Sequence, residues 1–191
     1  QYLTDLSTLP DYEEGGRYYG FGGTQGTPVD ADGNPIYYSV PESWEAAQSD
    51  GERWRWLLSQ VVENAPKRKW EIDTLFAEFL REQFGVNTLA QFSLYFSRTP
   101  DANAEGDESG TYALHTLAEN ETIARLATGV KRFDLPDEFN FIKIYQRIAQ
   151  EGDDYYADQS LVRLANLFAD RRQYPKSADY WKESLTRFAS R

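Results

Sequence analysis

Residues 158–191 have the sequence DQSLVRLANLFADRRQYPKSADYWKESLTRFASR, which carries the most informative helical pattern in the chain. Its apolar residues recur every three or four positions, which predicts two short amphipathic helices joined by a turn. Small residues interrupt both apolar faces, Ala165 in the first helix and Ser177 and Ser184 in the second. Because two helices cross closely only where side chains are small, this pattern predicts that the two helices pack directly against each other.

The same stretch has the layout of one tetratricopeptide repeat, a helix–turn–helix unit of 34 residues. When Asp158 is counted as the first position, large, small and aromatic side chains fall where the repeat places them. These residues are Leu161, Leu164, Ala165 and Phe168 in the first helix and Ser177, Trp181 and Ser184 in the second. We expect Trp181 to be buried against the first helix. Because such repeats stack into extended binding surfaces, the pattern favours a helical scaffold that binds other macromolecules.

Two stronger helices are predicted upstream, as an antiparallel pair with a short connection. The first opens at Ser49, where serine and glutamate have capping-box spacing, and it ends at Pro66. Residues 39–42 show the same spacing and predict an additional helix start. The second helix of the pair ends at Gly85. The apolar faces consist of Trp54, Leu57, Leu58 and Val61 in the first helix and Ile72, Leu75, Phe76, Phe79 and Leu80 in the second.

The middle of the chain allows two interpretations. Apolar residues alternate over residues 92–96 and again at 112–114, on either side of an acidic loop at 100–110. This alternation predicts a β-hairpin with a long exposed loop, and a helix over residues 88–96 is the alternative.

Two more helices are predicted between this region and the repeat-like pair. Asn120 is placed to cap the first, and residues 135–138 open the second, which stops at Gly152. The inward-facing residues are Ile123, Leu126, Ala127 and Val130 in the first helix and Phe141, Ile144, Tyr145 and Ile148 in the second.

Residues 1–38 are rich in Gly, Pro, Tyr and Asp, and their glycines break any periodicity, which predicts an irregular N-terminal arm. We therefore predict a mainly α protein, an α-solenoid of tetratricopeptide-like helix pairs with room for one small β-hairpin. The helical domain spans residues 39–191 and includes the acidic loop at 100–110 and the repeat-like pair at 158–191.

The composition of the chain limits the classes of partner that it can bind. The 191 residues carry a net charge of −11, which repels phosphate backbones and anionic membrane surfaces. We therefore expect neither nucleic-acid nor membrane binding, and no apolar run approaches the ~20 residues of a membrane span. Aromatic residues make up 15% of the chain, which is enough bulk for a folded core.

Few residues suggest catalysis or cofactor binding. The chain has no cysteine, and His115 is its one histidine, so thiolate chemistry and histidine metal pairs are excluded. Asp30, Asp32 and Asn34 have the one-three-five spacing of a calcium loop, but Pro41 stands where that loop needs a bidentate glutamate. An Asx-rich turn explains these residues better. We expect no catalytic, cofactor or metal site.

An enzyme remains the alternative function. The chain has 31 Asp and Glu residues, and carboxylate pairs that converge in space leave no spacing in the sequence. With the abundant Trp and Tyr, such a pair would suit a carboxylate-dependent glycoside hydrolase or lyase.

A candidate partner-facing patch lies on the first upstream helix. Trp56 falls off the apolar face of this helix, and Arg53 and Arg55 flank it. Trp and Arg are enriched in the residues that dominate binding energy at interfaces. A contact between these residues and the N-terminal segment is an equally good interpretation.

Residues 26–38 (GTPVDADGNPIYY), 50–58 (DGERWRWLL) and 121–143 (ETIARLATGVKRFDLPDEFNFIK) resemble the helical N-terminal region of large bacterial alpha-2-macroglobulin-like proteins. In that family a repeat-rich segment precedes β-sandwich domains, and proteases are trapped through a thioester cysteine and a bait region. This chain has no cysteine, so no functional residue of the family is carried over. The resemblance implies an extracytoplasmic segment, periplasmic or secreted, of a larger protein; a cytoplasmic location is the alternative.

These observations favour a non-catalytic module for protein–protein interaction or scaffolding. Its partner is expected to be another protein or the remainder of a larger polypeptide. Because the chain is acidic, basic or mixed-charge partners should be favoured, and salt should slow their association.

Overall fold

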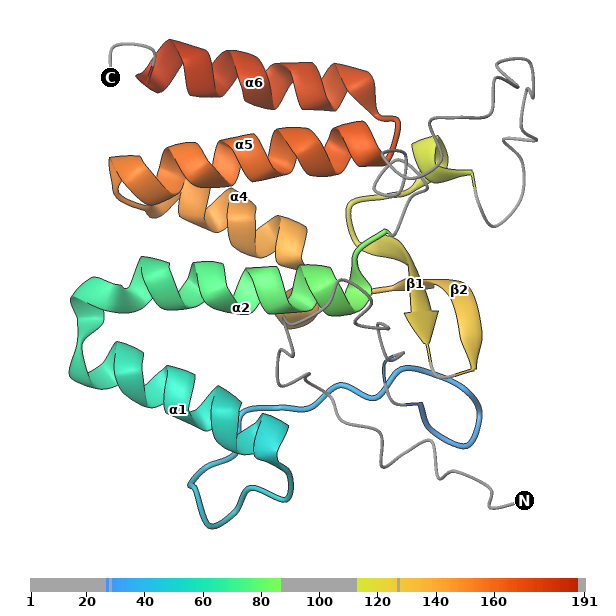
Figure 1. The fold of residues 1–191 in the computed structure, drawn as a ribbon, viewed down its shortest axis with the longest axis vertical. Helices are drawn as coiled ribbons and strands as arrows, with labels where there is room; N and C mark the ends of the chain where they lie inside the picture. Colours follow the sequence, from blue (N-terminus) through green and yellow to red (C-terminus); the bar gives the residue numbers. More distant parts are fainter. Residues whose placement is uncertain (1–26, 28, 87–112, 127, 189–191) are drawn as a thin grey trace, which may run out of the picture.

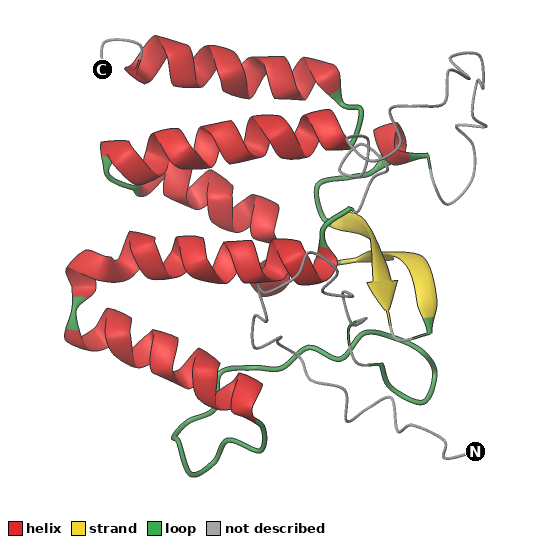
Figure 2. Ribbon diagram, viewed as in Figure 1, coloured by secondary structure: helices red, strands yellow, loops and turns green. Residues whose placement is uncertain are grey.

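The computed structural model describes residues 27, 29–86, 113–126 and 128–188. These residues are mainly helical, as the sequence predicts, and include one small antiparallel sheet (Figure 2). The main elements are α1 (Asp50–Asn64), α2 (Lys69–Phe84), β1 (Glu121–Leu126), β2 (Gly129–Asp134), α4 (Phe141–Glu151), α5 (Asp154–Asp170) and α6 (Tyr174–Phe188). The helices form a stack in chain order, with α1 at one end and α6 at the other (Figure 1).

Helices α1 and α2 form the predicted pair with a short connection. Ser49 caps α1, because its hydroxyl accepts a hydrogen bond from the Glu52 amide at 3.1 Å. Gly85 follows the last residue of α2, as expected. The helix start predicted at residues 39–42 is wrong, since residues 39–49 are irregular. There the Ser43 hydroxyl accepts from the Ala46 amide at 3.1 Å, a local turn that competes with a helix.

The inner face of α1 also differs from the prediction. Leu57 was expected on that face and is 45% exposed, whereas the charged Arg55 is buried. Among the described helices, α1 packs against α2 and lies at the end of the stack (Figure 1).

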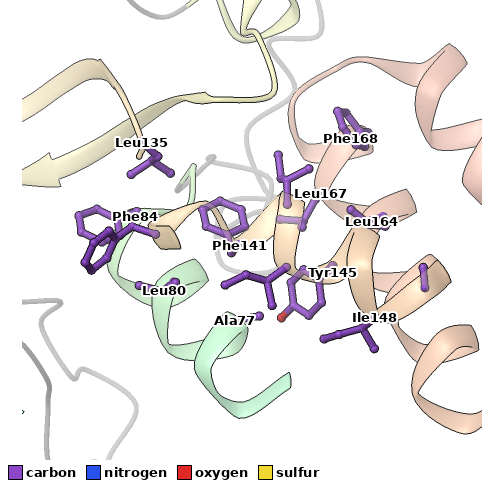
Figure 3. Close-up of a cluster of buried hydrophobic side chains, with 14 of the residues drawn as sticks. Ala77, Leu80, Phe84, Leu135, Phe141, Tyr145, Ile148, Leu164, Leu167 and Phe168 are labelled. Atoms are coloured by element: carbon purple, nitrogen blue, oxygen red, sulfur yellow. The ribbon is translucent and has the colours of Figure 1, made fainter. Parts of the chain in front are cut away.

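The main core lies where α2, α4 and α5 meet (Figure 3). The predicted stripe of α4 is confirmed, because each of its four residues is buried. Asn140 caps this helix and is itself buried: its side-chain oxygen accepts from the Ile142 amide at 3.0 Å, and its amide group donates to the Glu119 carbonyl. The stripe residues are Phe141, Ile144, Tyr145 and Ile148.

The helix predicted from Asn120 is wrong, because this segment forms the β1–β2 hairpin. Glu121 pairs with Asp134 at the open end of the hairpin, and Leu126 pairs with Gly129 beside its turn. Gly129 has a φ of +124°, which a side chain rarely tolerates. The Thr122 hydroxyl donates to the Phe84 carbonyl at the end of α2, so a tertiary contact holds β1 in place.

The α5–α6 pair is a helix–turn–helix unit with Ala165, Ser177 and Ser184 buried, as expected. Trp181, however, is not buried but 40% exposed. The aromatic partner of Phe168 is Tyr180, whose ring stacks on it with centroids 5.5 Å apart. Adjacent residues of a helix point about 100° apart, so Tyr180 and Trp181 lie on opposite edges of the face that carries Ser177 and Ser184, and Trp181 is left partly exposed.

Part of the predicted N-terminal arm belongs to the core. The Tyr37 ring lies 4.9 Å from the Phe139 ring, between centroids, and its hydroxyl donates to the Asp134 carbonyl at 3.1 Å. The described residues do not include most of the arm, the acidic loop at 100–110, or residues 88–112, for which a hairpin and a helix are the two interpretations. After this gap, Leu114–Thr116 form a short 3-10 turn.

Candidate interaction surface

The predicted partner-facing residues divide into buried and surface positions. Arg55 is 3% exposed, so its guanidinium is not part of an accessible patch, and this element of the prediction is corrected. The guanidinium carbon lies 5.4 Å from the centroid of the Phe79 ring and 5.9 Å from that of Tyr38. Aromatic rings on two sides attract the cation and cover its aliphatic stem, which explains the burial of a charged residue.

Arg53 and Trp56 lie in the first part of α1, are half-buried, and both contact Trp44 in the segment that precedes this helix. The Arg53 guanidinium donates to Asp50 at 2.7 Å and lies 5.7 Å above the ring of Trp44. The Trp44 and Trp56 rings meet edge to face, with centroids 6.1 Å apart. Trp44 is 43% exposed. Trp56 therefore contacts the segment just before α1, which lies outside the predicted N-terminal arm of residues 1–38. Of the three predicted patch residues, Arg55 is the one with a described contact to that arm, through Tyr38.

The sequence pattern did not identify Trp44, because this residue lies in an irregular segment where no periodicity indicates a face. Two exposed glutamates, Glu42 and Glu45, lie next to it in the chain. Within the described part of the chain, neither carboxylate has an ion-pair partner. We refer to Trp44, Trp56 and Arg53, with these two glutamates, as the tryptophan patch.

A second apolar surface lies on α6, at the other end of the stack (Figure 1). Tyr174, Trp181 and Leu185 are exposed, and with Ala178 they follow each other at intervals of four, three and four residues. This spacing places the four side chains on one line along the helix. We call these four residues the α6 stripe.

A polar network joins the segment before β1 to the middle of α4, the end of α5 and the start of α6. Glu119 accepts from Lys176 at 2.8 Å and from Gln146 at 3.0 Å, and the Lys176 contact is the main reason that its pKa is lowered. Arg171 is buried and donates to the Ala118 carbonyl at 3.1 Å. Burial lowers the pKa of Arg171 to about 10. Each contact ties two segments together, so we assign this network a structural role.

The calcium-like spacing at residues 30–34 forms an Asx turn, as the sequence favours. Asp30 accepts from the amides of Asp32 at 2.9 Å and Asn34 at 2.8 Å, and the Asn34 bond is the largest cause of its lowered pKa. Among the described residues, no three His, Cys, Asp or Glu side chains are grouped as metal ligands. No helix in the described ranges combines the length and apolarity of a membrane span.

Comparison of the chain with protein-family models, curated proteins and solved structures finds no match.

Proposed function

We propose that this chain is a non-catalytic protein–protein interaction or scaffold module with tetratricopeptide-like helix pairs. The observation that carries the proposal is the α6 stripe. Helix α6 uses one face for α5, through Ser177 and Ser184, and exposes Tyr174, Trp181 and Leu185 beside that face.

The stripe has the shape that a helical partner would fit. Its residues recur at the spacing with which one helix packs on another, whereas an extended strand would need alternation. Leu185 is 62% exposed, and burying a large apolar side chain contributes roughly 1.5–3 kcal/mol. A helix laid along α6 would gain this energy and would extend the stack by one layer.

The partner helix belongs either to another protein or to the remainder of a larger polypeptide. The resemblance to alpha-2-macroglobulin-like proteins supports the second source and an extracytoplasmic location, periplasmic or secreted. An antibody against this chain should detect a larger product in the periplasmic or secreted fraction of the native cells. A signal confined to the cytoplasm would contradict this part of the proposal.

The interaction itself is tested by adding charge to the stripe. The double variant Trp181→Glu/Leu185→Glu should lose partners that the unchanged chain retains in a pull-down from native extract. The matched control is Tyr155→Glu/Gln150→Glu, which adds the same charge at exposed sites outside α6. If both double variants capture partners equally well, the α6 stripe is not the binding surface.

The alternative is a carboxylate-dependent glycoside hydrolase or lyase. A general acid of such an enzyme needs a raised pKa, whereas every carboxyl with a shifted pKa among the described residues has a lowered one, namely Asp30, Glu71, Glu119 and Glu121. Cleavage of a polysaccharide by the purified chain, abolished by a single Asp or Glu substitution, would establish the enzyme instead.

A further inference from the structure

We infer that the tryptophan patch binds an arginine-rich peptide segment of a partner protein. This inference rests on the proposed interaction function and adds the chemistry of the ligand. It concerns a different surface from the α6 stripe, at the opposite end of the helix stack (Figure 1).

The patch already holds a guanidinium group. Arg53 lies over the Trp44 ring at 5.7 Å, and its charge is balanced by Asp50 at 2.7 Å. A tryptophan ring attracts cations at its face because the π-electron cloud there is negative. Trp44 remains 43% exposed, so part of the ring is open to a second cation from outside.

The charge next to Trp44 selects a basic ligand. Glu42 and Glu45 are exposed and, among the described residues, have no ion-pair partner. Arginine suits the site better than lysine, because its planar guanidinium stacks on a ring and pairs with a carboxylate at the same time. The chain's net charge of −11 would also steer a basic segment toward it.

The ring geometry favours a peptide over a sugar. Trp44 and Trp56 meet at an interplanar angle of 68°, so the two rings do not form one flat platform. A neutral sugar would leave the charge of Glu42 and Glu45 unbalanced, whereas a guanidinium group offers both a planar face for the ring and a positive charge for these acids. Glycan binding at this patch would be a competing result of the experiment.

The experiment measures fluorescence anisotropy of a labelled ten-residue peptide with five arginines alternating with serines. We expect binding at 25 mM salt and a roughly tenfold or larger weakening at 300 mM, since the contacts at the patch are charged. Trp44→Ala should weaken binding about fivefold or more at both salt concentrations, because it removes the stacking surface. Glu42→Gln/Glu45→Gln should weaken binding about fivefold at low salt only, because its contribution is electrostatic.

Matched controls separate the patch from the general acidity of the chain. Tyr155→Ala removes another exposed aromatic ring, outside both surfaces, and Glu138→Gln/Glu151→Gln removes two exposed acids elsewhere. Both variants should change the affinity less than about twofold. Absence of binding, or an equal loss in the controls, would overturn the inference. Binding of neutral oligosaccharides that is lost in Trp44→Ala would assign the patch to glycans. None of these results bears on capture through the α6 stripe, so the two proposals fail independently.

Discussion

Helix α4, of 11 residues, and helix α6, of 15 residues, both contact the main core but bury different kinds of side chain. Helix α4 lies inside the stack and buries six side chains that are almost all apolar, whereas α6 lies at the end and buries two serines. Polar contacts supplement the α6 interface: Ser184 donates to Asp158 at 2.6 Å, and Arg187 donates to the Ala149 carbonyl at 3.0 Å. The inner helix α4 has helices on two sides and buries its apolar face, whereas the end helix α6 leaves large apolar side chains at the surface.

The largest expected effect is on the inner helix. Phe141 is fully buried in the main core (Figure 3), so Phe141→Ala should lower the free energy of unfolding by about 3–5 kcal/mol. Urea denaturation followed by circular dichroism measures this loss. A loss below about 1 kcal/mol would mean that the inner helix contributes no more to stability than the end helix.

Alkaline pH should lower the stability of the fold through Tyr145, a buried residue of the same inner helix. Burial raises the pKa of Tyr145 to about 12, above its ordinary value of 10.0. Between these two values the unfolded chain releases the proton and the folded chain keeps it, so stability should fall as pH rises from 10 to 12. Two pKa units correspond to about 2–3 kcal/mol.

Tyr145→Phe should remove this part of the alkaline sensitivity. Its buried hydroxyl interacts with Arg81 but forms no hydrogen bond of good geometry within the described residues, so the variant should lose less than about 1 kcal/mol at pH 7. Urea midpoints at pH 7, 10 and 11.5 provide the measurement. Tyr155→Phe, at an exposed site, is the control and should keep the pH dependence of the unchanged chain.

Substitutions of helix caps should show the same contrast between inner and end helices, with smaller losses of stability. Asn140 caps the inner helix α4 and is fully buried, so Asn140→Ala should cost about 2 kcal/mol. Ser49 caps the end helix α1 and is half-buried, so Ser49→Ala should cost about 0.5–1 kcal/mol. Melting temperatures of the two variants give the ranking, and the reverse order would contradict it.

The smallest effect is expected on the end helix itself. Trp181 is 40% exposed, so Trp181→Ala should change the free energy of unfolding by less than about 1 kcal/mol. Tyr180→Ala is the matched comparison and should cost more, because that ring stacks on Phe168 and its hydroxyl accepts from Gln146 at 2.9 Å. Equal losses in the two variants would mean that both rings contribute to the interface with α5.

Much of the candidate site lay beyond sequence reasoning. Arg53 and Trp56 were identified from their place on a helix wheel, and they lie together at the surface. Trp44, which brings them together, lies in a segment without periodicity. The helical periodicity of α1 also could not indicate that Arg55 is buried, because the rings near its guanidinium group, Tyr38 and Phe79, come from two other segments of the chain.

The sequence by itself determined the helical class, the pair α5–α6, and the ends of several helices. Apolar periodicity and helix-terminating glycines act over a few residues, and Gly85 and Gly152 follow α2 and α4 as expected. Tertiary structure alone decided that residues 121–134 form a hairpin, because the Thr122 hydroxyl bonds the Phe84 carbonyl, 38 residues away in the chain. It also decided that Tyr180, not Trp181, packs on Phe168, since the rotation of α6 depends on Ser184 meeting Asp158 and on Gln146 meeting Tyr180. Contacts between distant segments leave no local pattern, and these contacts set the faces of the helices.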